Sequence, residues 1–303
     1  MIEINPELSA FIEMFPKLDL QKDTLDQTRT LIASFAPKPL DPNPTEFFVP
    51  SLTDADSRIR ALKYSPEKNT PCPVMIQFHG GGFVLGAAED SHFHNHLISS
   101  KLGITVIAVD YRLAPENPYP AAIEDGHSVV SWVLSHADEL GVDPEKLIIS
   151  GESAGGGIAA SLAHFLGQET EIGPTSLQLI YPMLDPRSGQ ADMGNTPRHI
   201  WTVENNNVAW DMYAPNSIED IRSNLPIASI DLTHFPPTAI YVGTADLFHN
   251  ENQRFSGALK EANVETDIYS YEGGVHGFPM AIGTQISAAF WEDYLKNIEK
   301  HLS

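Results

Sequence analysis

From about residue 73 onward, continuous apolar runs alternate with longer segments of mixed polarity. The runs are not interrupted at every second position, which is the pattern of strands in a parallel sheet that is covered on both faces. Six such strands are predicted, with the sequences VMIQFH, ITVIAVD, KLIISG, SLQLIY, TAIYVG and ETDIYSY.

Helix-forming stretches separate these strands. They are predicted at about residues 120–136, 153–167, 250–262 and 287–301. Regular alternation of strand and helix predicts an α/β chain with a mostly parallel, doubly wound sheet.

Two regions do not follow this alternation. Residues 1–44 resemble two short helices, with a helix start at Asn5-Pro6-Glu7 and Leu25, Ile32 and Phe35 on one face. Residues 186–225 are polar and carry no strand signal. Both could be surface excursions, but we expect them to form a helical cap on a catalytic domain of residues 45–303, over the carboxyl edge of the sheet where ligands bind. The aromatic residues expected to be exposed at this cap are Phe11, Phe15, Phe35, Trp201 and Trp210.

Composition narrows the functional classes. The 303 residues include 40 acidic and 18 basic ones, a net charge of −22, which disfavours nucleic-acid binding. The acidic, proline-interrupted N-terminus is unlike a signal peptide, and no apolar run is long enough for a membrane span. The single cysteine, Cys72, excludes an internal disulfide. We therefore expect a soluble cytoplasmic protein; whether it forms a homodimer stays open.

The stretch LIISGESAGGGIAASLA carries the most specific signal. A predicted strand ends at Ser150, the pattern G-E-S-A-G follows, and a helix-forming run begins at once. Strand, tight turn and helix are the context of a nucleophile elbow with Ser153 at its tip. A phosphate-binding loop is the competing interpretation, but the chain lacks the Gly-Lys-Ser/Thr that would contact a nucleotide.

A serine hydroxyl needs a base, and that base needs an orienting carboxylate. In chains with this elbow the order is Ser, then Asp or Glu, then His. Asp246 ends a predicted strand, and His276 follows the last strand between glycines that allow its loop to reach the elbow. Both are predicted partners of Ser153, with Glu251 as the alternative acid.

The glycines of HGGGF follow the strand at residues 73–78. Acyl transfer places negative charge on the carbonyl oxygen, and backbone N–H groups commonly stabilise it. We predict donors at Gly81, Gly82 and Ala154, with His79 bracing the loop. Phe83, which follows the glycines, is a candidate for contact with substrate.

The sequences HGGGF, DYRLAPENPYPAAIED, GESAGG, YPMLD and GGVHGF together resemble the hormone-sensitive-lipase family of bacterial carboxylesterases. The match runs in order from about residue 73 to the C-terminus. It implies the α/β-hydrolase fold, the triad Ser153, Asp246 and His276, the oxyanion donors above, and a cap that includes Trp201 as a candidate for substrate contact. The chain departs from the family where Glu152 replaces a frequent Asp, and where Asn250 replaces an acid after the triad acid.

One further pattern concerns metals. His92 and His96 have the spacing of zinc ligands on a helix, but the Glu of H-E-x-x-H and a third ligand are missing. We therefore expect neither a metal nor a cofactor.

The predicted function is hydrolysis of small carboxylic esters with acyl chains of about two to six carbons, a length implied by the family resemblance. A small-molecule receptor and an amide hydrolase are the alternatives.

Overall fold

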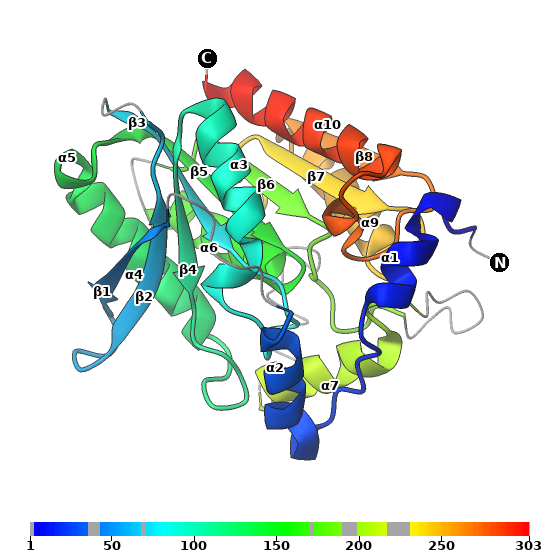
Figure 1. Cartoon of the computed structure of the whole chain (residues 1–303). Coiled ribbons are helices and arrows are strands. Elements are labelled where there is room, and N and C mark those ends of the chain that lie inside the picture. The colour runs from blue at the N-terminus through cyan, green and yellow to red at the C-terminus, as the bar shows by residue number, and fades with distance from the viewer. Residues whose placement is uncertain are drawn as a thin grey trace.

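A single eight-stranded sheet forms the centre of the molecule (Figure 1), in the order β1-β2-β4-β3-β5-β6-β7-β8. The computed structural model describes residues 3–35, 43–67, 71–169, 173–189, 199–216 and 231–302. Strand β2 pairs antiparallel with β1 and β4, and all other pairs are parallel. The strands are β1 (Thr45–Pro50), β2 (Arg58–Tyr64), β3 (Cys72–Phe78), β4 (Thr105–Asp110), β5 (Val142–Glu152), β6 (Ser176–Ile180), β7 (Thr238–Gly243) and β8 (Thr266–Tyr271).

Helices cover both faces of the sheet. On one face α3 contacts α10, and on the other α4 contacts α6, with α9 in the same apolar cluster as α6 (Figure 1). The helices are α1 (Ser9–Met14), α2 (Leu25–Ala33), α3 (His92–Leu102), α4 (Ala121–Ser135), α5 (Ala137–Leu140), α6 (Ala154–Glu169), α7 (Val203–Tyr213), α9 (His249–Glu261) and α10 (Gln285–Leu302). Short 3-10 turns are η1 (Pro6–Leu8), η2 (Lys22–Thr24), η3 (Ala88–Ser91) and η4 (Phe278–Met280).

The central strands show why their apolar runs are continuous. Val74 and Ile76 of β3 belong to the core on the α6 face, whereas Met75 between them belongs to the core on the α10 face. Side chains alternate between the two faces of a strand, and both faces here are covered. The predicted α/β class and mostly parallel sheet are confirmed.

Strands β1 and β2 and helices α3 and α5 were not predicted. Strands β1 and β2 form the antiparallel edge, and β1 leaves most of its side chains exposed or half-exposed. Such an edge does not produce a continuous apolar run, so the signal used for the central strands is absent. Helix α3 carries His92, Asn95 and His96 among its apolar residues, which obscures its periodicity.

The N-terminal segment lies beside α7, near the carboxyl ends of the strands (Figure 1). Asn205 of α7 accepts a hydrogen bond from the Leu20 N–H (3.0 Å) and donates one to the Leu18 carbonyl (3.1 Å). Arg29 of α2 donates to the carbonyls of Val84 (2.9 Å) and Ala114 (2.8 Å). These bonds attach the segment to both α7 and the sheet domain.

Parts of the two predicted cap regions, residues 1–2, 36–42, 190–198 and 217–225, lie outside the described residues. In the part of the chain that is described, no helix combines the length and apolarity needed to cross a membrane.

Candidate active site

The turn between β5 and α6 holds Ser153 in a sharp conformation. Its φ is 54°, a left-handed value that non-glycine residues rarely adopt. A Cβ at Gly151 would lie 2.1 Å from the Gly155 carbonyl oxygen, so this crossing needs glycine. The Ser153 N–H donates to the Ile180 carbonyl (2.9 Å), and the Met183 N–H donates to the Ser153 carbonyl (2.9 Å). Neighbouring backbone thus holds the strained residue in place.

Three side chains that are distant in sequence form one hydrogen-bonded chain. His276 Nε2 lies 2.9 Å from Ser153 Oγ, and His276 Nδ1 lies 2.8 Å from Asp246 Oδ2. All three side chains are buried. Asp246 follows β7 and His276 follows β8, so both reach the elbow from the carboxyl ends of neighbouring strands.

The carboxylate determines which imidazole nitrogen carries the proton. Asp246 accepts at Oδ2, so Nδ1 of His276 must donate, and the lone pair of Nε2 then faces Ser153 Oγ. The Ser153 hydroxyl donates to that lone pair. This arrangement can remove the hydroxyl proton as the oxygen attacks an electrophile.

The alternative acid, Glu251, does not reach the histidine. Its Oε1 accepts a hydrogen bond from the Leu184 N–H at 2.7 Å, on the loop that follows β6. Burial raises the pKa of Glu251 well above its ordinary value. Of the two carboxyl groups considered from the sequence, the structure brings only Asp246 to His276.

The loop after β3 presents free backbone donors. The N–H groups of Gly81 and Gly82 have no hydrogen-bond acceptor among the described residues. Ala154 begins α6, where the first N–H groups of a helix lack an intrahelical partner. Gly82 has a φ of 61°, and a Cβ there would lie 2.3 Å from the Trp201 ring. The loop therefore needs glycine at this position.

His79 and Tyr111 hold the glycine loop in place through hydrogen bonds and ring stacking. His79 Nδ1 donates to the Gly80 carbonyl (2.7 Å), and the Tyr111 hydroxyl donates to the His79 carbonyl (2.9 Å). The two rings stack with centroids 4.2 Å apart. Burial lowers the pKa of His79, which favours the neutral ring. Tyr111 belongs to the DYRLAPE motif, whose structural contribution the sequence did not specify.

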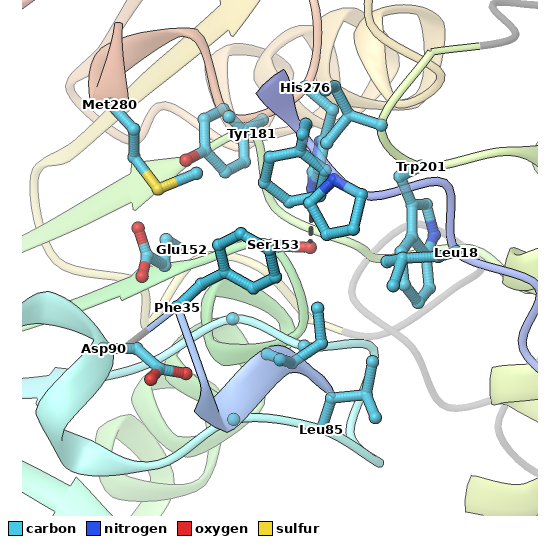
Figure 2. Close-up of a pocket in the computed structure, with 18 of the residues that line it drawn as sticks. Leu18, Phe35, Leu85, Asp90, Glu152, Ser153, Tyr181, Trp201, His276 and Met280 are labelled. Carbon is cyan, nitrogen blue, oxygen red and sulfur yellow. Dashed lines mark hydrogen bonds between the residues drawn. The ribbon is translucent and has the colours of Figure 1, made fainter. Parts of the chain in front are cut away.

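A cavity of about 330 Å³ opens over Ser153 and His276 (Figure 2). Its walls are largely apolar and come from the N-terminal segment, the glycine loop and the segment before α7. Side chains of the N-terminal segment that line it are Phe11, Met14, Phe15, Leu18, Ile32 and Phe35. The sequence did not identify Asp90, Glu152, Tyr181 or Met280 as cavity residues; what they share is a position at or just after the end of a strand or in a short turn near the carboxyl edge of the sheet.

The aromatic residues differ in part from expectation. Trp201 lines the cavity but is only 4% exposed, and Trp210 is buried, so neither is an exposed residue of the cap. Phe83 is buried, and its ring stacks on that of Tyr213 with centroids 3.9 Å apart. It is not part of the cavity wall. Its position supports the fold of the loop rather than contact with substrate.

The first histidine of the pair on α3 has another partner. His92 Nδ1 forms a short hydrogen bond with the Tyr64 hydroxyl, and His92 is buried. Over the described ranges, no group of three His, Cys, Asp or Glu side chains is placed to hold a metal ion.

Comparisons with known proteins identify the family of this chain. A family model described as the alpha/beta hydrolase fold matches residues 75–280. The chain is 29% identical to a carboxylesterase of Mycobacterium tuberculosis over 91% of this chain and 89% of that protein. It is 26% identical to an ethyl acetate hydrolase of Pseudomonas putida, over 95% of each. A bacterial heroin esterase structure has a TM-score of 0.92 at 29% identity, covering 99% of this chain and 98% of that one.

The family match spans more than half of the chain and includes the turn at Ser153, the glycine loop, Asp246 and His276. The resemblance to esterases predicted from the sequence is therefore confirmed, as is the expectation of a carboxylic ester hydrolase. The chain belongs to the α/β-hydrolase family that includes the hormone-sensitive-lipase-like carboxylesterases.

Proposed function

We propose that this chain hydrolyses small carboxylic esters with short acyl chains through a covalent acyl-enzyme on Ser153. The observation that carries the proposal is the continuous hydrogen-bonded chain from Asp246 through His276 to Ser153 Oγ, with distances of 2.8 and 2.9 Å. It ends in a cavity large enough for a small substrate.

The first half-reaction transfers the acyl group to serine. As Ser153 Oγ bonds to the ester carbonyl carbon, its proton passes to His276 Nε2. The carbonyl oxygen becomes an anion that the N–H groups of Gly81, Gly82 and Ala154 would stabilise, an effect worth roughly 3 kcal/mol per donor. His276 then gives the proton to the leaving alcohol as the carbon–oxygen bond of the ester breaks.

The second half-reaction regenerates the enzyme. Water replaces the alcohol, His276 takes its proton, and the resulting oxygen nucleophile attacks the acyl carbon. The tetrahedral intermediate collapses, the acid leaves, and the proton returns to Ser153 Oγ. Asp246 stabilises the imidazolium in both halves without itself taking a proton.

The size of the cavity supports a preference for short acyl chains. Its volume of about 330 Å³ lies at the lower end of the range for small-molecule sites, roughly 300–1,000 Å³. Phe11, Phe15 and Leu18 line it together with Trp201, which lies against the glycine loop at Gly82. The name of the ethyl acetate hydrolase gives independent support for a small ester.

We also propose that residues 1–44 and the insertion 186–225 act as the cap that bounds this cavity. The support is that both contribute lining side chains, and that Asn205 joins them by two hydrogen bonds. Trp201→Ala should enlarge the cavity and shift the acyl-length preference toward longer chains. An unchanged profile would show that the cap does not set chain length.

The decisive assay is kcat/KM for p-nitrophenyl esters from two to sixteen acyl carbons. We expect a maximum between about two and six carbons, a length that follows the family resemblance. Ser153→Ala should lose activity on all of them, on the order of 10⁶-fold, since the nucleophile is gone. Near-normal turnover by a folded Ser153→Ala protein would refute the mechanism, and a preference for long chains would refute the substrate range.

A further inference from the structure

The active-site cavity is asymmetric in charge. Figure 2 shows Glu152 and Asp90 on one side of Ser153, with Leu18 and Trp201 on the other. Glu152 directly precedes the nucleophile, and Asp90 lies in η3 after the glycine loop. Among the described residues that line the cavity there is no Lys or Arg. One end of an otherwise apolar pocket therefore carries two acids.

Neither acid has a cationic partner. Glu152 Oε1 accepts from the Ser91 hydroxyl (2.9 Å), and Asp90 Oδ2 accepts from the Ala87 N–H (3.2 Å). Across the described ranges, neither forms an ion pair, whereas Glu89, adjacent to Asp90, is paired with Arg60. Each carboxyl group therefore retains unused acceptor capacity beside the cavity.

Burial raises the pKa of both acids, and the negative charge of Asp90 further raises the pKa of Glu152. A buried carboxylate without a counter-charge is unfavourable, and a nearby cation relieves that cost. The described residues that line the cavity include no Lys or Arg to supply the positive charge that these two groups would favour.

The neighbouring wall also suits a cation. Phe35, Tyr181 and Met280 line the cavity and lie on the acidic side in Figure 2. Aromatic faces attract alkylammonium groups, and they also provide apolar surface for the methyl groups of a quaternary ammonium. A metal ion such as Mg²⁺ would gain nothing from this aromatic wall, because it binds through several oxygen ligands.

We propose that Asp90 and Glu152 form a subsite for an ammonium group on the substrate, so that the enzyme prefers cationic esters to neutral esters of the same shape. This inference rests on the proposed esterase function and specifies its substrate class. Glu152 and Asp90 line the same cavity as Ser153, so an ester held at Ser153 can place a cation beside the two acids.

The kinetic test compares matched esters. Acetylcholine and 3,3-dimethylbutyl acetate have the same shape and differ in the charge of the alcohol part. Ethyl 4-(trimethylammonio)butyrate and ethyl 5,5-dimethylhexanoate do the same for the acyl part. After correction for their rates of hydroxide hydrolysis, at least one cationic ester should have a kcat/KM roughly tenfold above its neutral counterpart. The pair that shows the preference identifies which half of the ester occupies the subsite.

Two conservative variants test the residues. In Asp90→Asn and Glu152→Gln the ratio of cationic to neutral kcat/KM should fall several-fold, and in the double variant it should approach one. Glu139→Gln removes an equal charge from an exposed position on α5 and should leave the ratio unchanged. A ratio near one for both ester pairs in the original chain, or the same fall in Glu139→Gln, would overturn the inference.

A binding measurement separates this inference from the proposed function. Calorimetry on Ser153→Ala protein with acetylcholine and 3,3-dimethylbutyl acetate requires no hydrolysis. Tighter binding of the cation that disappears in Ser153→Ala/Asp90→Asn/Glu152→Gln supports the subsite even if no ester is cleaved. Equal binding of the two esters, together with normal hydrolysis of neutral esters by the original chain, refutes the subsite and leaves the esterase function standing.

Discussion

Replacing Asp246 by Asn changes one atom of the site and should remove most of the activity. Asp246 accepts two hydrogen bonds, from the Phe248 N–H at Oδ1 (2.9 Å) and from His276 at Oδ2 (2.8 Å). In the Asn variant, the Phe248 N–H requires the carbonyl oxygen on its side. The NH₂ group then faces His276 Nδ1, which must accept rather than donate.

The consequence is an imidazole with its proton on the wrong nitrogen. A neutral His276 that accepts at Nδ1 carries its proton on Nε2, where it can no longer remove the Ser153 proton. Rotating the amide instead would place its NH₂ against the Phe248 N–H in a buried site, which leaves two donors unpaired. We therefore expect kcat to fall roughly 10⁴-fold, or about 5.4 kcal/mol in activation free energy.

The assay is kcat and KM on p-nitrophenyl acetate for Asp246→Asn beside Glu251→Gln. Glu251 is also a buried acid after β7, but its contact is the Leu184 N–H, which a Gln carbonyl can equally accept. The loss of activity in the Glu251→Gln variant should therefore stay within a few-fold. Comparable losses in the two variants, or a larger one in Glu251→Gln, would refute the assignment of Asp246 as the orienting acid.

Three further outcomes are expected. Burial raises the pKa of Glu251, so its ionisation opposes folding as the pH rises above the ordinary carboxyl range. Glu251→Gln should therefore raise the melting temperature at pH 8 more than at pH 5. An equal rise at the two pH values would contradict this. Gly82→Ala should lower kcat by roughly 10²-fold or more, with a smaller change in KM. The reason is that the added Cβ would displace Trp201 and the adjacent oxyanion donor. An unchanged kcat with a raised KM would mean that the loop only binds substrate. Arg29→Ala leaves two carbonyl acceptors unpaired and should lower the free energy of unfolding by about 1–3 kcal/mol in urea titrations, whereas an exposed change such as Lys101→Ala should not.

The central fold was predictable because burial on two faces leaves a local signature. The parallel strands in the interior of the sheet have continuous apolar runs, and β3 shows the cause, with adjacent residues in opposite cores. The antiparallel edge has no such signature. Strand β2 carries Arg58, Arg60 and Lys63 on its less buried positions, and its pairing with β1 depends on long-range contacts.

The site was predictable where chemistry constrains sequence. The elbow requires glycine around Ser153, and chain order limits the acid and base, so the three side chains that the structure brings together could be named in advance. The cavity walls could not. Asp90 and Glu152 come together only because they line one cavity. Phe83 is buried against Trp210 and Tyr213 of α7, a contact that local sequence does not reveal.

The most direct test of the central claim is covalent capture of the nucleophile. Diethyl p-nitrophenyl phosphate should release one p-nitrophenol per chain as activity disappears, with the diethylphosphoryl group found by mass spectrometry on the peptide that contains Ser153. Asp246→Asn protein should react far more slowly, since His276 no longer activates the hydroxyl. An adduct on another residue, or complete inactivation with Ser153 unmodified, would contradict the account.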